Sequence, residues 1–173
     1  MKKIAKMIAA AIVMVVISVN VNAQAIATAT ATATIVSPIS IAKNVDMNFG
    51  NITVNAFAGG IVTLDPSLAA TRTANAGGGV TLPAFTGTVS AAKFSVSGQA
   101  NFTYDITLPL SATLSNSGNN MIADNFTSSI VSGTLDATGT EIFYVGADLN
   151  VNAGQAPGVY VTGTPFFVAV NYN

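Results

Sequence analysis

Hydrophobic and polar residues alternate along much of this chain with a period of two, which is the pattern of strands with one buried face. The clearest run is 102–108, where apolar side chains alternate with Thr and Asp up to Pro109. Similar runs predict further strands at 61–64, 93–96, 140–145, 147–151 and 164–172. Clusters of Gly, Asn, Asp and Pro between the runs are typical of turns. The pattern predicts an all-β domain, either a sandwich or a barrel, but sets no register for 111–126.

Residues 24–36 alternate differently, because they are built almost entirely from Ala and Thr. In an extended strand, one face would be mostly Ala and the other mostly Thr. The Ala face comprises Ala25, Ala27, Ala29, Ala31, Ala33 and Ile35. This tract is either a low-complexity linker or a strand that pairs with something else. Pro38 ends the pattern, so we expect a donor strand or linker at 24–43 and a β-sandwich domain at 44–173.

The first 23 residues have the features of a secretory signal peptide. Lysines precede an apolar stretch at 7–17, and Val21-Asn22-Ala23 resembles a cleavage site. The stretch is shorter than the roughly 20 residues that span a bilayer, which disfavours a permanent anchor. We therefore expect removal of 1–23, a mature chain that begins at Gln24 and has no membrane span, and export to the periplasm and then the cell surface.

Composition restricts the chemistry that this chain can perform. It has no His and no Cys, which excludes His- or Cys-based nucleophiles, zinc sites and thiol redox centres. Six Lys and Arg stand against seven Asp and Glu, and without the leader three cations remain, so the mature chain is weakly acidic. With no basic excess, we expect no nucleic-acid partner.

The remaining polar residues mark no catalytic centre. Asp136 and Glu141 flank a Gly-containing turn and could share a metal, but solvated strand ends explain such acids as well. A glycosidase needs two carboxylates on either side of the scissile bond, and the sequence pattern singles out no such pair. Lys93 lies in an alternating strand, where a solvent-facing cation is expected. We expect no enzyme activity, no cofactor and no metal site.

Glycines and aromatics also have structural explanations. Gly77-Gly78-Gly79 is interpreted as a turn, because a strand-like segment follows it where a phosphate loop needs a helix. Six aromatics at strand periodicity are predicted to lie in the core rather than on a sugar-binding surface. They are Phe94, Phe102, Tyr104, Phe143, Phe166 and Tyr172. The pattern does not place Phe57, Phe85 or Phe126.

Several short motifs, taken in order, resemble the bacterial domain-of-unknown-function family 4402. They include MNFGNI at 47–52, GIVTLDP at 60–66, AKFSVSG at 92–98, VGADLNV at 145–151 and the closing segment 158–172. The resemblance covers nearly all of the chain after Asn44, and that family has no established activity. Its closing pattern is similar to spore coat protein U domains and to the pilins of archaic chaperone-usher pili.

The resemblance implies an exported, Ig-like antiparallel β-sandwich that lacks one strand, which an N-terminal donor strand completes. The implied function is that of a structural subunit of a bacterial surface filament, a homopolymer formed by donor-strand exchange. A periplasmic chaperone and an outer-membrane usher are the implied partners. The C-terminal edge strand is expected to present Phe166, Val168, Val170 and Tyr172 to the chaperone and then to the donor. The alternative is a monomeric secreted or cell-surface module that binds a ligand through its loops and does not polymerise.

Overall fold

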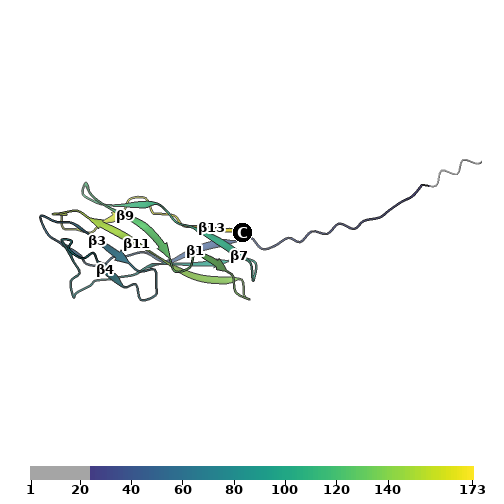
Figure 1. Cartoon of the computed structure of the whole chain (residues 1–173), viewed down its shortest axis with the longest axis horizontal. Helices are drawn as coiled ribbons and strands as arrows, with labels where there is room; N and C mark the ends of the chain where they lie inside the picture. The colour runs from purple at the N-terminus through teal and green to yellow at the C-terminus, as the bar shows by residue number, and fades with distance from the viewer. Residues whose placement is uncertain (1–23) are drawn as a thin grey trace, which may run out of the picture. The chain divides into compact units, whose positions relative to one another are not determined.

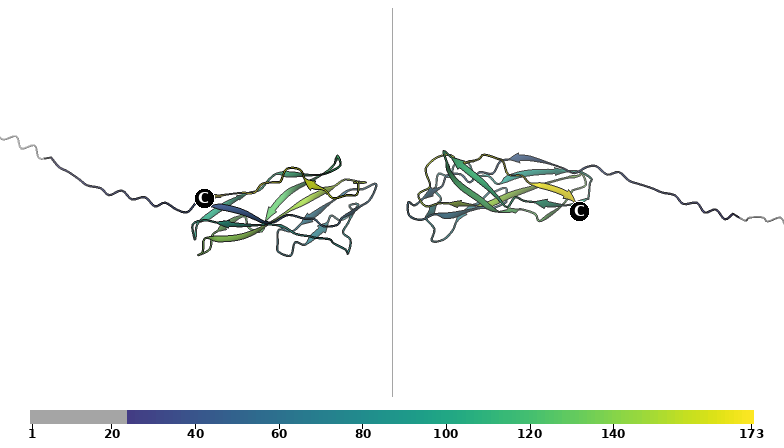
Figure 2. Two further views of the ribbon diagram at one scale, coloured as in Figure 1. Left: turned by 180° about the vertical axis from the view of Figure 1, so that it is seen from behind. Right: turned by 90° about the horizontal axis from the view of Figure 1, so that it is seen from above.

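The structure is a computed structural model that describes residues 24–173, so the expected signal peptide at 1–23 lies outside the described residues. Residues 24–173 contain no α-helix and form an antiparallel β-sandwich (Figure 1). Figure 2 shows the same strands from behind and from above. The prediction of an all-β sandwich is therefore confirmed.

The larger sheet has eight strands. They are β1 (Ser40–Val45), β3 (Gly60–Leu64), β4 (Arg72–Ala74), β6 (Ala92–Ser97), β8 (Ser111–Asn116), β9 (Asn119–Ser128), β11 (Thr140–Val151) and β12 (Val161–Thr162). Their order is β1-β6-β11-β9-β8-β12, with β3 beside β11 and β4 beside β3.

Two smaller sheets complete the fold. One has the order β10-β7-β13, and the other pairs β2 with β5. Their strands are β2 (Thr53–Val54), β5 (Val80–Thr81), β7 (Thr103–Thr107), β10 (Ser132–Thr134) and β13 (Ala169–Tyr172). The predicted strand at 164–172 is thus regular only over its last four residues.

The predicted strands at 140–145 and 147–151 are one continuous strand, β11. Its first half pairs with β6 and its second half with β3, and Gly146 lies between the two halves. A Cβ on Gly146 would stand 2.0 Å from the carbonyl oxygen of Leu64. Glycine is therefore needed where the strand changes partner, and it does not mark a turn.

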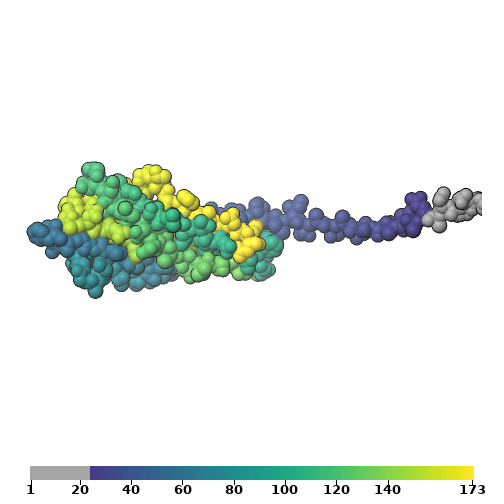
Figure 3. Space-filling view, turned by 45° about the horizontal axis from the view of Figure 1, so that its top comes forward, coloured from purple at the N-terminus to yellow at the C-terminus, as the bar shows by residue number. Residues whose placement is uncertain are grey.

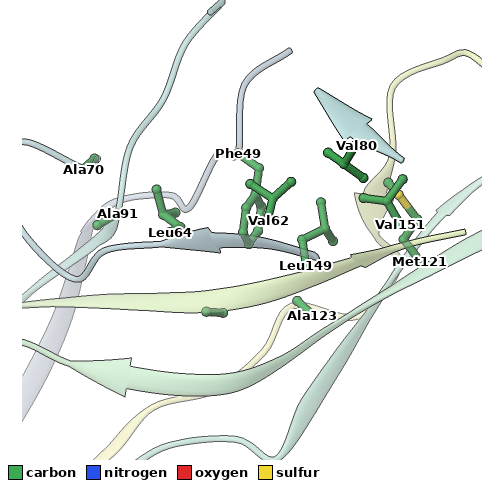
Figure 4. Close-up of a cluster of buried hydrophobic side chains, with 11 residues drawn as sticks. Phe49, Val62, Leu64, Ala70, Val80, Ala91, Met121, Ala123, Leu149 and Val151 are labelled. Atoms are coloured by element: carbon green, nitrogen blue, oxygen red, sulfur yellow. The ribbon is translucent and has the colours of Figure 1, made fainter. Parts of the chain in front are cut away.

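The core consists of two hydrophobic clusters. The first contains Phe49, Val62, Leu64, Ala70, Val80, Ala91, Met121, Ala123, Ala147, Leu149 and Val151 (Figure 4). The second contains Ala92, Phe94, Val96, Tyr104, Leu135, Phe143, Val145 and Val170. The second cluster fills the space between the larger sheet and the β10-β7-β13 sheet. The rings of Phe94 and Phe143 stack there, with their centroids 5.5 Å apart.

The aromatic residues divide between core and surface. Phe94, Tyr104 and Phe143 are buried, as predicted. Phe166 and Tyr172 are only partly buried against the second cluster, and Phe102 is 40% exposed. Phe126, which the sequence pattern did not place, packs against both clusters. Phe57 and Phe85 are exposed in loops.

Two local features were not predicted. The irregular segment 111–126 contains β8 and most of β9, joined at Ser117 and Gly118, which both have positive φ (48° and 86°) as in a tight hairpin turn. The first strand begins at Ser40, ahead of the domain boundary that we expected near Asn44.

Arg72 holds two loops against β4. Its guanidinium donates to the carbonyl oxygens of Phe49 and Asn51, the latter at 2.7 Å, and to that of Thr86 at 3.4 Å. Burial lowers the pKa of Arg72. A planar group with several donors suits this cluster of carbonyl oxygens, so Arg72 has a structural role.

Candidate functional site

The N-terminal tract, residues 24–35, forms no strand in the structure. Its residues are exposed, including the Ala face that the sequence pattern singled out from Ala25 to Ala33. Ile35, the last residue of that face, is 97% exposed. An alternating, strand-like segment therefore remains without a partner strand among the described residues.

The C-terminal edge is the second part of the candidate site. β12 pairs with β8, and β13 pairs with β7. The two pairings have the same register, because Val161 lies opposite Ser115 and, eight residues later, Ala169 lies opposite Thr107. Residues 161–172 thus run as one interrupted edge beside 104–115. Among the described residues, no strand pairs with the other side of β12 or β13. We call this side the free edge, and Figure 3 shows the C-terminal segment in yellow along the surface of the sandwich.

The C-terminal part of the free edge, β13, lies close to β1, which is an edge strand of the larger sheet. β1 pairs with β6 on one side only, and the described residues supply no strand on its other side. We call the line between β1 and the 166–172 segment the seam. Side chains from both sides of the seam pack against the second core cluster but are only partly buried: Ile39, Ile41, Phe166, Val168 and Tyr172. Val170 lies between the last two and is buried.

Tyr172 closes one end of the seam. Its hydroxyl accepts a hydrogen bond from the backbone N–H of Gln99 at 2.6 Å and donates one to the carbonyl oxygen of Ser37 at 3.0 Å. The N–H of Ser37 in turn donates to Oε1 of Gln99 at 3.3 Å. A Cβ on Gly98 would stand 2.1 Å from the Tyr172 hydroxyl, so the glycine makes room for it. We call these contacts the Tyr172 clasp.

Two aromatic contacts fix the side chains along the seam. Tyr172 packs edge-on against Phe102, with ring centroids 5.5 Å apart. Phe166 packs against Phe126 at 5.0 Å. The four apolar residues assigned to one face of the C-terminal strand, at 166, 168, 170 and 172, therefore all pack against the same core cluster.

Asp136 and Glu141 have different neighbours in the structure. Asp136 accepts hydrogen bonds from the N–H and hydroxyl of Thr138 at 2.8 and 2.6 Å, and from the N–H of Thr140 at 3.0 Å. These bonds, that from the Thr138 hydroxyl above all, lower the pKa of Asp136 to about 2. Asp136 therefore stabilises its turn. No group of three or more potential metal-ligating acids occurs in the part of the chain that the structure describes.

Glu141 lies beside Tyr104, which belongs to the second cluster. The Tyr104 hydroxyl and Oε2 of Glu141 are both buried, and neither has a well-oriented hydrogen-bond partner among residues 24–173. Burial first, and then the neighbouring Glu141, raise the pKa of Tyr104. A Cβ on Gly133 would stand 2.1 Å from Cζ of Tyr104 and 2.4 Å from Oε2 of Glu141. The sequence pattern did not indicate this polar pair, because its members come from two strands that are far apart in the chain, β7 and β11.

No helix within residues 24–173 has the length and apolar character needed to cross a membrane.

Comparison with known proteins places the chain in a family. The model of a domain of unknown function, DUF4402, matches residues 39–172. No curated protein and no solved structure matches the chain. The matched segment begins one residue before β1 and ends with β13, so it contains every strand of the sandwich. The chain therefore belongs to the DUF4402 family.

Proposed function

We propose that this protein is an exported structural subunit of a bacterial surface filament, similar to a pilus or fimbria. In this proposal, the N-terminal tract of one copy adds as a strand to the free edge of the next copy. The observation that carries it is the presence, in one chain, of an unpaired alternating tract and a free edge with partly buried apolar side chains. Unpaired edges promote association with other chains, and adding a strand satisfies their backbone groups.

The lengths of the two segments support the proposal. The free edge spans residues 161–172, and the alternating tract spans 25–36, so each contributes twelve residues. The Ala side chains of the tract can bury little apolar area. Burial of each methyl-sized group contributes only about 0.8 kcal/mol to the free energy of association. Backbone hydrogen bonds along the free edge would therefore supply much of the stabilisation.

The proposal includes a route to the surface. The leader at 1–23 directs the chain to the periplasm and is removed before Gln24, which releases the tract. A periplasmic chaperone then covers the edge that carries Tyr172, and an outer-membrane usher assembles the homopolymer. The proposal assigns no catalytic role, cofactor or metal to any residue.

A second candidate function is a monomeric surface module that binds a ligand through its loops. Phe57 favours it, because this aromatic is 94% exposed in the loop between β2 and β3. That loop is ordered by hydrogen bonds, since Asn55 Oδ1 accepts from the Phe57 N–H at 2.8 Å and the Asn55 carbonyl from the Gly154 N–H at 2.9 Å. In this alternative the Ala/Thr tract is only a tether.

The state of the purified mature chain, residues 24–173, distinguishes the two functions. Filament assembly predicts a ladder of oligomers, which deletion of 25–36 abolishes and excess peptide of sequence 25–36 inhibits. Replacement of the central Ala29 with Asp should also block assembly, because an unpaired charge would be buried. A monomeric wild-type chain that does not bind the peptide contradicts the filament proposal and favours the loop-binding module.

A further inference from the structure

The side chains of the chain itself already occupy the interior of the seam. Phe166 and Tyr172 point from the C-terminal segment into the second cluster, together with Val168 and Val170. Phe166 is held against Phe126, and Tyr172 is held by Gln99 and Ser37. An added strand would therefore meet bulky side chains along the free edge, and little depth is left for large side chains of its own.

The tract provides small side chains in the alternation that this seam requires. If 25–36 pairs end to end with 161–172 in the antiparallel direction, directly opposed residues lie on the same face. Ala25 then faces Tyr172, Ala27 faces Val170, Ala29 faces Val168 and Ala31 faces Phe166. Four Ala residues of the tract thus lie opposite bulky residues of the edge, and Ala33 lies opposite Thr164.

The parallel alternative reverses this arrangement. In an end-to-end parallel pairing, Ala25 would lie beside Val161, and the odd-numbered tract residues would share a face with Phe167, Ala169 and Asn171. The Thr face and Ile26 would then point toward the bulky side chains of the seam. A change of register by one residue has the same effect, since it moves every side chain to the other face.

We infer that the seam selects, by side-chain size, an Ala-faced strand from a second copy of this chain, in the antiparallel register that sets Ala31 against Phe166. The inference rests on the proposed function and adds the direction, the register and the determinant of specificity. It also explains why the tract is built from Ala and Thr: the Ala face fits the filled seam, and the Thr face is left for solvent.

The first test exchanges large and small residues in the mature full-length chain. Ala31→Phe is expected to lower polymer yield at least about tenfold, the effect of overpacking by more than about 1.4 kcal/mol. Thr32→Phe is the matched control on the other face and should change the yield less than about twofold. Phe166→Ala combined with Ala31→Phe should restore assembly. Equal yields for Ala31→Phe and Thr32→Phe, or no recovery in the combined variant, would overturn the inference.

The second test does not depend on the folding of a Phe166 variant. The chain has no Cys, so a pair of introduced cysteines reports their proximity alone. Directly opposed residues have Cα atoms about 4.5–5.5 Å apart, which suits a disulfide. Ala33→Cys with Thr164→Cys should give a ladder of disulfide-linked chains under oxidation. Ala33→Cys with Ala169→Cys is the parallel register and should not.

The outcomes separate this inference from the proposed function. Cross-linking of the pair at 33 and 169, or of neither pair in a chain that polymerises, contradicts the register and leaves the filament proposal standing. A disulfide within one monomer contradicts donation to a second copy. A wild-type chain that never forms oligomers contradicts the filament proposal itself.

Discussion

The hydroxyl of Tyr172 donates a hydrogen bond to the carbonyl oxygen of Ser37, 135 positions earlier in the chain. This contact joins the last strand of the sandwich to the segment that precedes the first. Because Pro38 follows Ser37, the backbone at Ser37 is also biased toward an extended conformation. The clasp therefore attaches Ser37, which directly precedes Pro38, to the last strand of the sandwich.

Tyr172→Phe should weaken the clasp without removing the ring. Loss of the two hydrogen bonds is expected to lower the free energy of unfolding by about 1–2 kcal/mol, measured by denaturant titration. Tyr160→Phe is the matched control, since the Tyr160 hydroxyl also makes two hydrogen bonds, to Gln155 and Ala156, away from the seam. If the proposed function holds, only Tyr172→Phe reduces polymer yield beyond its effect on stability. Equal reductions would make Tyr172 an ordinary packing residue.

Gly133→Ala should destabilise the sandwich strongly. The new methyl group would overlap the buried Tyr104 ring and the buried Oε2 of Glu141, so we expect a loss of about 2–3 kcal/mol. Gly163→Ala is the control, because a Cβ there has no atom within 4 Å. The midpoints of thermal unfolding compare the two. Similar midpoints would show that the Tyr104 and Glu141 side chains can move aside.

Asp136 should make stability depend on pH in the acid range. Its pKa is about 2 in the folded chain and about 3.9 when unfolded, so the unfolded chain binds the proton more tightly. The stabilisation from this carboxylate is present above pH ~4 and is lost as the pH falls from 4 to 2. Asp136→Asn should therefore lose less stability than the wild type over that range. Asp105→Asn, an exposed carboxylate outside the turn, is the control, and identical pH profiles for the Asp136 variant and the wild type would contradict the prediction.

Arg72→Lys should destabilise the protein although it keeps the charge. A lysine ammonium cannot reproduce the planar set of donors that contacts the carbonyl oxygens of Phe49, Asn51 and Thr86, and we expect a loss of about 1–3 kcal/mol. Lys43→Ala tests an exposed cation, whose ion pair with Asp46 is open to solvent and should contribute less than about 1 kcal/mol. Chemical denaturation of both variants checks the ranking. A larger loss for Lys43→Ala would contradict it.

Sequence patterning predicted the strands whose faces differ in polarity. Residues 102–108 and 93–96 alternate cleanly, because one face of each strand lies in the core and the other faces solvent. The hairpin at 111–126 escaped prediction, since it carries many Ser, Thr and Asn and its turn depends on positive φ at Ser117 as well as at Gly118. Gly146 separated two predicted strands, 140–145 and 147–151, whereas it lies inside the single strand β11.

The sequence by itself determined the class of fold, the absence of His and Cys chemistry, and the existence of an alternating Ala/Thr tract apart from the domain. Those properties follow from local periodicity and composition. Only the tertiary structure decided that 161–172 keeps one register beside two earlier strands, that no strand within residues 24–173 pairs with its other side, and that Phe166 and Tyr172 pack into the seam. Edges, seams and buried pairs such as Tyr104 and Glu141 are made by residues far apart in the chain, and local alternation contains no information about which strands become neighbours.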